Sequence, residues 1–176
     1  MKDVLQYCLL FLILLGCQGV GYAQLNESDV KAAYIERFTR FVEWSDDDQD
    51  SVFIITVVGQ NTLGTSLDSV FHDGRINSQN VVVSYCEDFS SISKTDLIFV
   101  CNSEKNELSQ IVQRFSASPV LIISDTKGFA TAGTHINMYV DDRYIRFEIN
   151  KNALEKSGLK ISSLLLAAAK IVKSDD

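Results

Sequence analysis

One stretch of the sequence contains the three residue types of a hydrolytic triad. Ser124, Asp125 and His135 supply a hydroxyl, a carboxylate and an imidazole, the groups that activate a serine for acyl transfer. No G-x-S-x-G turn is present to expose such a serine at the end of a strand. His72 and His135 are the only histidines, and both fall beside or within expected surface elements. We therefore expect no catalytic site and interpret the chain as a protein that is not an enzyme.

Metal chemistry is equally weakly indicated. The acidic run Asp46–Asp48 has no glycine or histidine beside it to shape a cation site. The cysteines Cys86 and Cys101 do not have the spacing of a zinc knuckle. We expect neither a metal ion nor a cofactor.

The same two cysteines could instead form a disulfide in an oxidising compartment. Cys86 and Cys101 are expected at the ends of strands that need not be neighbours. A disulfide needs Cα atoms within about 7 Å. Two alternatives therefore remain: the cysteines form a disulfide, or they stay unpaired and are buried as small hydrophobic residues.

The most informative polar pattern lies near the C-terminus, in the strand-like run YIRFEIN. Alternation predicts that Ile145, Phe147 and Ile149 face the core. The opposite face then displays Tyr144, Arg146, Glu148 and Asn150. A protein-binding surface combines apolar anchors with oriented polar groups. The candidate partner-binding residues are Ile136, Arg146, Glu148, Asn150, Leu154, Lys160 and Ser162, with Trp44 as a further anchor.

Simpler explanations compete for several of these residues. Arg146 and Glu148 lie two apart on one strand face and could form only a solvated pair worth under about 1 kcal/mol. Asn150 could cap the next helix, and Lys160 could act only as a solubilising charge. These alternatives remain open at this point.

The elements that would position these groups alternate between strand and helix. Strands are expected at Val52–Val58, a continuous β-branched run, and at Val81–Tyr85, Asp96–Val100 and 120–124. Their alternation with helices predicts a mainly parallel sheet covered on both faces. A hairpin around Asp141-Asp142 follows. The predicted fold is α/β: a single-domain, three-layer, mainly parallel sheet with a C-terminal antiparallel hairpin and flanking helices. Asn61, Asn102 and Asp125 follow strand ends, where such sheets bind ligands, although plain turns use the same residues.

Two helices are expected at the ends of this domain. The first begins near Glu27 and carries a buried stripe of apolar residues at helical spacing: Val30, Ala33, Tyr34, Phe38, Phe41 and Val42. The last, at about 162–173, is apolar on nearly every side apart from Lys170. Such a helix should be buried, either in the domain or against a partner.

Residues 1–23 resemble a secretory signal peptide, with an apolar run and the small residues Gly21-Tyr22-Ala23 at its end. An imperfect lipobox, Leu14-Leu15-Gly16-Cys17, leaves open a lipid anchor on Cys17. Residues 24–176 then form one domain. The formal charge of −7 and the lack of a basic run argue against nucleic acid as a partner.

Several motifs together resemble the YfiR-like (HmsC-like) exported proteins. They are VKAAYIERFTRFVEW, VFIITVVG, SDTKGFATAGTHIN, IRFEIN and SGLKISSLLLAAAKIV. The resemblance implies a periplasmic α/β protein that represses an inner-membrane diguanylate cyclase by binding its periplasmic domain, which lowers cyclic di-GMP and biofilm formation. An outer-membrane lipoprotein would relieve the repression by sequestering the repressor. Thr95 stands where many relatives carry cysteine, so a family-type disulfide is not expected there.

Two other functions remain as alternatives. One is a periplasmic sensor that binds a small molecule at the strand ends, and the other is a secreted hydrolase that uses Ser124 and His135. A homodimer formed through the apolar final segment is also left open.

Overall fold

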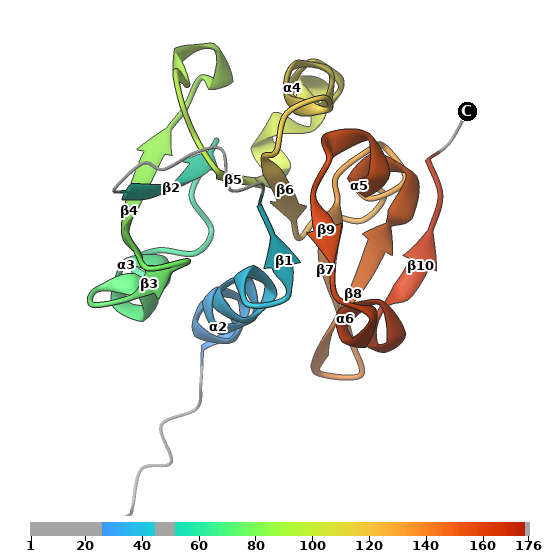
Figure 1. Cartoon of the computed structure of the whole chain (residues 1–176), viewed down its shortest axis with the longest axis horizontal. Helices are drawn as coiled ribbons and strands as arrows, with labels where there is room; N and C mark the ends of the chain where they lie inside the picture. Colours follow the sequence, from blue (N-terminus) through green and yellow to red (C-terminus); the bar gives the residue numbers. More distant parts are fainter. Residues whose placement is uncertain (1–25, 45–51, 175–176) are drawn as a thin grey trace, which may run out of the picture.

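One eight-stranded sheet organises the described residues, 26–44 and 52–174, of this computed structural model (Figure 1). The expected signal peptide, with Cys17, and the acidic run 46–48 lie outside the described residues. Within residues 26–44 and 52–174, no helix has both the length and the apolar character needed to cross a bilayer.

The strand order across the sheet is β10-β8-β7-β6-β5-β2-β4-β3. The strands, in chain order, are β2 (Val52–Val58), β3 (Arg75–Ile76), β4 (Gln79–Cys86), β5 (Leu97–Val100), β6 (Leu121–Ser124), β7 (Ile136–Asp141), β8 (Tyr144–Asn150) and β10 (Lys170–Val172). The neighbours from β4 through β7 are parallel, and so are β8 and β10. The pairs β3–β4 and β7–β8 are antiparallel. The central strands therefore follow the 2-1-3-4-5 order of doubly wound folds.

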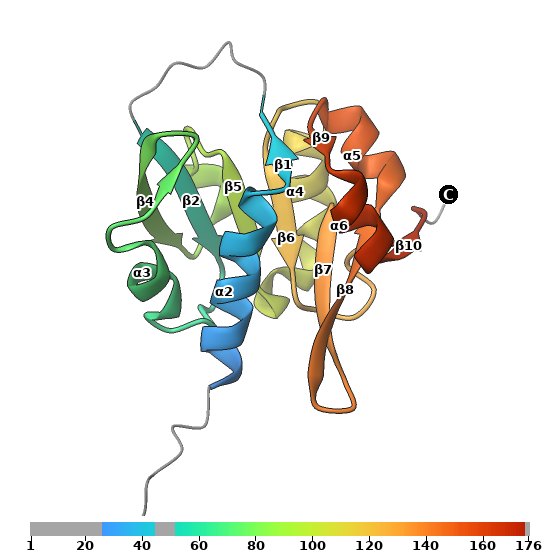
Figure 2. The ribbon, with the colours of Figure 1, turned by 60° about the horizontal axis from the view of Figure 1, so that its bottom comes forward.

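Helices cover both faces of this sheet. On one face lie α2 (Glu27–Thr39), α3 (Ser66–Phe71) and α6 (Ser163–Ala168), and on the other lies α4 (Leu108–Phe115) (Figure 2). Each face buries its own apolar cluster, one containing Phe38 and Phe147, the other Ile111 and Ile122. All four residues of β5 and of β6 are buried, which explains their uninterrupted apolar sequences. The predicted three-layer α/β sheet with its C-terminal hairpin is confirmed.

The predicted last helix is wrong beyond its first turns. Helix α6 ends at Ala168, Ala169 is extended (φ −96°, ψ 154°), and Lys170–Val172 forms β10. An apolar run without a clear period cannot distinguish a helix from a strand. The helix is also not buried on every side, because Leu164 is 71% exposed.

The buried face of α2 also differs from the prediction. The helix buries Ala32, Ile35 and Phe38 against the sheet. Ala33 is exposed, and Val30 and Tyr34 are only partly buried. Helix α2 therefore has two adjacent apolar faces, of which only one packs on the sheet.

A second, two-stranded sheet joins the two ends of the domain. Strand β1 (Val42–Glu43) follows α2 and pairs antiparallel with β9 (Lys160–Ile161), which follows α5 (Lys151–Ser157). The Ser162 N–H also donates to the Phe41 carbonyl at 2.9 Å. These bonds hold the end of α2 beside the start of α6, as Figure 2 shows.

Candidate functional site

The two apolar anchors predicted from the sequence are core residues. Ile136 is 0% exposed and Leu154 is 2% exposed. Ile136 pairs with Ile149 across β7 and β8, so its side chain shares the core face. Trp44 packs edge-on to Phe53, with ring centroids 5.0 Å apart, and donates to the Asp96 carbonyl. None of the three is a free anchor, and the prediction for Ile136 and Leu154 is wrong.

Asn150 is also part of the interior. Its side chain is 0% exposed and accepts from Ala153 N–H at the start of α5. Its amide donates to the Ala130 carbonyl and to the Ser174 hydroxyl. Asn150 is thus a helix cap that ties the strand to the loop after β6, and its prediction as a contact residue is wrong.

Glu148 and Arg146 differ although they share a strand face. The Glu148 side chain is 12% exposed, lies 3.5 Å from Lys170 Nζ and accepts from the Asn137 amide. Arg146 is exposed and pairs with Asp141 at 2.7 Å. Lys170 of the neighbouring strand β10 contacts Glu148, and the loop after β6 binds Asn150. The polar side chains of β8 therefore do not form one continuous docking surface.

Lys160 lies in β9 of the two-stranded sheet, and Ser162 directly follows that strand. Lys160 is exposed and opposite Glu43 in the ladder. Ser162 is partly exposed, and its hydroxyl accepts from Leu164 N–H as the N-cap of α6. Both residues therefore have structural roles of their own, Lys160 in the ladder with β1 and Ser162 as a helix cap.

The triad residue types do not assemble. Ser124 is buried and bonds to Thr134 and Asn137. His135 is buried, contrary to the surface position expected, and its Nδ1 accepts from Ile122 N–H at 3.1 Å. Burial lowers the pKa of His135 to about 4, so the ring stays neutral at pH 7 and holds the sheet together. Asp125 instead forms a 2.7 Å ion pair with Lys31.

The two cysteines are free thiols. They lie on opposite sides of β2, at its end. The Gly59 N–H donates to the Cys86 carbonyl on one side, and the Cys101 N–H donates to the Val58 carbonyl on the other. Two strand spacings amount to about 9.5 Å, which is beyond the reach of a disulfide. Burial raises the pKa of both thiols, that of Cys101 to about 11. Neither is a reactive thiolate at neutral pH.

Several polar groups at the strand ends bond within the chain. Asn61 bonds to Leu63 and Gly64 within one turn. Ser103, just after Asn102, accepts from Gln60 N–H at 2.9 Å across the β2–β5 switch point. Burial lowers the pKa of Lys31, but hydrogen bonds and charges from Asp125 and Glu27 outweigh that effect and raise it. Asn61 and Asp125, two of the residues expected to hold a ligand here, thus already have partners within the chain. No cluster of three metal-ligating side chains occurs among the described residues.

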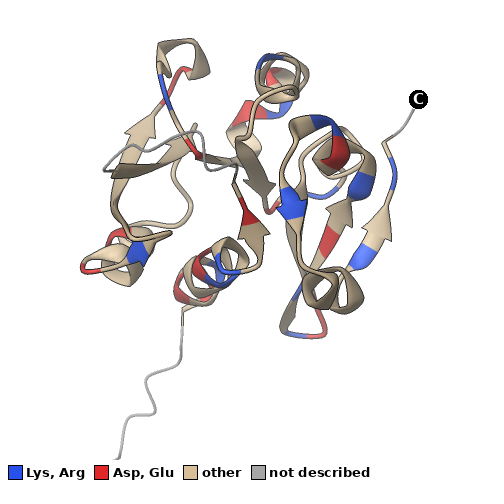
Figure 3. Ribbon diagram, viewed as in Figure 1, with Lys and Arg blue, Asp and Glu red and all other residues tan. Residues whose placement is uncertain are grey.

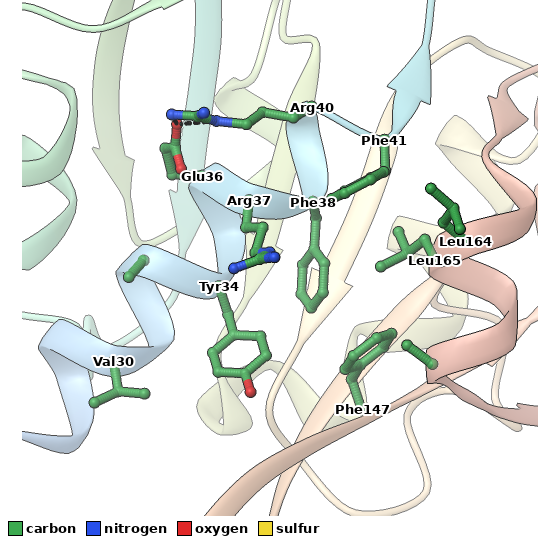
Figure 4. Close-up of a pocket in the computed structure, with 12 residues that line it drawn as sticks. Val30, Tyr34, Glu36, Arg37, Phe38, Arg40, Phe41, Phe147, Leu164 and Leu165 are labelled. Atoms are coloured by element: carbon green, nitrogen blue, oxygen red, sulfur yellow. Dashed lines mark hydrogen bonds and ion pairs between the residues drawn. The ribbon is translucent and has the colours of Figure 1, made fainter.

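A groove of about 970 Å³ lies between α2 and α6 (Figure 4). We call it the α2–α6 groove. Its lining comes from three elements and the turn after α2: Val30, Ala33, Tyr34, Glu36, Arg37, Phe38, Arg40, Phe41, Phe147, Leu164, Leu165 and Ala168. Buried Phe38 and Phe147 form its floor, and exposed Leu164 stands at its lip. The second apolar face of α2 is therefore one wall of an open hydrophobic groove.

Charged groups on α2 border this groove. Arg40 is held by Glu36 through a 2.7 Å hydrogen bond from Nε. Arg37 is exposed and extends over the groove in Figure 4. The border therefore carries two cations and one anion in a chain whose net charge is −7.

A second groove of about 870 Å³ continues along α2 toward the β7–β8 hairpin. Val30 and Tyr34 line both grooves. The hairpin side contributes Val140 and Tyr144, which are 53% and 70% exposed. Tyr34 fixes the hairpin to α2 by donating to the Ile145 carbonyl at 3.2 Å.

Local sequence pattern does not point to the residues of the α2–α6 groove. Phe41 and Tyr34 belong to the predicted buried stripe, and no pattern distinguishes Arg37 from the other charges of the helix. The run Leu164–Leu166 could have indicated the groove. A two-turn helix cannot bury three consecutive leucines on one side, so at least one of them must be exposed at the surface. The groove is defined by packing between distant segments, which one sequence does not reveal.

Three comparisons place this architecture among known proteins. The model of the YfiR/HmsC-like family, DUF4154, matches residues 28–170. A conserved domain protein from Vibrio cholerae O1 biovar El Tor is 14% identical with a TM-score of 0.55, covering 85% of this chain and 61% of that chain. An ABC domain in complex with L-Trp from Streptococcus pneumonia is 12% identical with a TM-score of 0.54, covering 84% and 62%. At these identities the two structures show the fold alone, and the chain spans about three fifths of each. No curated protein matches the chain.

Proposed function

Because the chain belongs to the YfiR/HmsC-like family of periplasmic regulators of diguanylate cyclase signalling, we propose that it represses an inner-membrane diguanylate cyclase by docking onto the cyclase's periplasmic domain. The docking surface is the α2–α6 groove. Repression lowers cyclic di-GMP and, with it, biofilm formation. The chain acts by binding and carries no chemistry of its own.

The observation that carries this proposal is the exposed apolar lip of the groove. Leu164 is 71% exposed directly above a floor of packed aromatic rings. An accessible apolar pocket with a polar border has the anatomy of a protein–protein hot spot. An aromatic or leucine side chain of the cyclase would fill the groove between Phe41 and Leu164.

The border charges add orientation to this contact. Arg37 and Arg40 favour an acidic residue on the cyclase beside its apolar anchor. Since both arginines are exposed, they affect the association rate and its salt dependence more than the final affinity.

An outer-membrane lipoprotein that relieves repression would use the same groove. Two partners that need one apolar pocket exclude each other, so the lipoprotein would release the cyclase by competition. Lys160 on β9 and Ser162, the N-cap of α6, come just before the α6 wall of the groove and would contact such a partner at its edge.

The test is the affinity of the Leu164→Asp variant for the isolated periplasmic domain of the cyclase, measured by biolayer interferometry. A buried charge at the lip should weaken binding by about tenfold or more. Val82→Asp is the matched control, since Val82 is also an exposed apolar side chain (49%) but lies on β4, at the far end of the sheet.

Equal affinity of the Leu164→Asp variant and the unchanged protein would refute the groove as the docking surface. In cells, the same variant should raise the level of cyclic di-GMP, while the amount of the variant protein in the periplasm stays normal. A thermal-shift screen in which a small molecule raises the Tm markedly, with no binding to the cyclase, would favour the sensor alternative instead.

A further inference from the structure

Strand β4 has an open outer edge. Along its inner side it pairs with β2 from Asn80 to Cys86. On its outer side, β3 pairs only with Gln79 and Asn80. From Val81 to Tyr85, therefore, no other described strand lies along the outer edge. Backbone donors and acceptors on such an edge are a ready template for another strand.

The same segment exposes apolar side chains. Val82 is 49% exposed and Tyr85 is 42% exposed. Helix α3 covers one face of the strand, where the Tyr85 hydroxyl donates to Asp68 at 2.5 Å. Val82 and Ser84 point to the opposite face and are both exposed, since residues two apart share a face.

The segment also lacks the features that normally protect an edge. Residues 76–86 contain no Lys, Arg, Asp, Glu or Pro, and β4 carries no charge colour along its length in Figure 3. Edge strands usually carry a lysine, a proline or a bulge that prevents pairing. In an acidic chain, an uncharged strand is the surface on which a second, equally acidic copy meets the least repulsion.

From this arrangement we propose that two copies of the chain associate through β4, with residues 81–85 of each paired antiparallel about a two-fold axis at Val83. A two-fold axis perpendicular to a sheet requires one residue to lie opposite itself. Strand β3 blocks pairing beyond Asn80, and β4 ends at Cys86, so the open stretch is centred on Val83.

The side chains match in this register. Val82 of one copy lies opposite Ser84 of the other on the uncovered face. Val81 lies opposite Tyr85 on the face of α3, which is a favourable pairing of a β-branched and an aromatic residue. A second copy occupies both open edges at once and joins two sheets into one. The proposal concerns the end of the sheet away from β10 and α6, so both α2–α6 grooves stay accessible in the dimer.

The primary test is light scattering coupled to size exclusion of the purified full chain over a range of concentrations. We expect a monomer–dimer equilibrium, and Val82→Lys combined with Ser84→Lys should raise the dimer Kd by about tenfold or more, because the charges meet across the two-fold axis. Both positions are exposed, so circular dichroism and the Tm should not change. Leu164→Lys is the control and should leave the dimer intact.

A cross-linking experiment tests the register. In a chain with Cys86→Ser, Val83→Cys places two thiols at the two-fold axis, and mild oxidation should yield a covalent dimer. A dimer that persists in the double-lysine variant overturns the proposal, as does a protein that stays monomeric at all concentrations. Loss of the dimer in Leu164→Lys alone would assign the interface to the apolar final segment instead and would also overturn it.

These outcomes are independent of the proposed repression. The double-lysine variant should still bind the isolated cyclase domain with unchanged affinity per site, whereas Leu164→Asp should dimerise and fail to bind. Failure of one proposal therefore leaves the other testable.

Discussion

Phe38 of α2 and Phe147 of β8 pack edge to face, with ring centroids 4.9 Å apart and an interplanar angle of 60°. This contact joins the first helix to the C-terminal hairpin strand. Tyr34 contacts both rings, at 5.9 Å and 6.3 Å. The three rings thus serve the core and the groove floor at the same time.

Removing one of these rings should test the core assignment. Phe147 is 9% exposed, so Phe147→Ala should lower the free energy of unfolding by about 3–5 kcal/mol, measured by urea denaturation. Leu164→Ala is the control on the groove lip and should change it by less than about 0.5 kcal/mol. Equal effects of the two substitutions would mean that the floor is not part of the core.

His135 should make stability depend on pH below neutrality. The folded pKa is about 4 against an ordinary 6.5, so between these values the unfolded chain binds a proton that the folded chain excludes. The stabilisation that the neutral ring provides should therefore be fully present above pH 6.5. The free energy of unfolding should fall by about 3 kcal/mol as the pH drops from 6.5 to 4. His135→Asn, which keeps an acceptor for Ile122 N–H, should flatten this dependence in urea titrations.

His72 provides the control for this pH experiment. It is 81% exposed in its side chain, so His72→Asn should leave the pH dependence as it is in the unchanged chain. If His72→Asn flattened the curve and His135→Asn did not, the assignment of the titrating group would be wrong.

The Glu148–Lys170 pair should control how firmly β10 is attached. Glu148→Lys places a cation beside Lys170 and removes the acceptor of the Asn137 amide. We expect the free energy of unfolding to fall by about 1–3 kcal/mol and the amide hydrogens of residues 170–172 to exchange faster. Adding Lys170→Glu to that variant should recover part of the loss. Arg146→Glu, on the exposed pair with Asp141, should cost less than about 1 kcal/mol.

The tight turn between β3 and β4 offers a stabilising substitution. Asn77 and Ser78 have φ values of 50° and 69°, a conformation that favours glycine at the second position. Ser78→Gly should raise the free energy of unfolding by about 0.5–1 kcal/mol. Ser69→Gly, inside α3, should lower it by a similar amount, and a gain at both positions would contradict the conformational argument.

The centre of the sheet was predictable because β2, β5 and β6 are buried on both faces. The apolar sequences of β5 and β6 admit few other placements. Local alternation also predicted the hairpin, although its turn is at Asp142-Arg143 and not at Asp141-Asp142. The registers of β7 and β8 then determine which side chains face the core. Local pattern was sufficient for these elements.

The partner-binding residues were not predictable, because coverage of a strand face depends on distant segments. Alternation correctly separated Phe147 and Ile149 from Glu148 and Asn150. It could not show that Lys170 on β10 would pair with Glu148 or that the loop after β6 would bind Asn150. Likewise, the spacing on α2 identified its apolar residues but not which of its two faces would meet the sheet.

The β1–β9 pairing has a consequence for when this protein can act. Val42 and Ile161 come from opposite ends of the domain, and the walls of the groove form only when these ends meet. A chain that has not finished folding has no complete groove. If the groove is the docking surface that we propose, docking would therefore occur only after translocation and folding are finished.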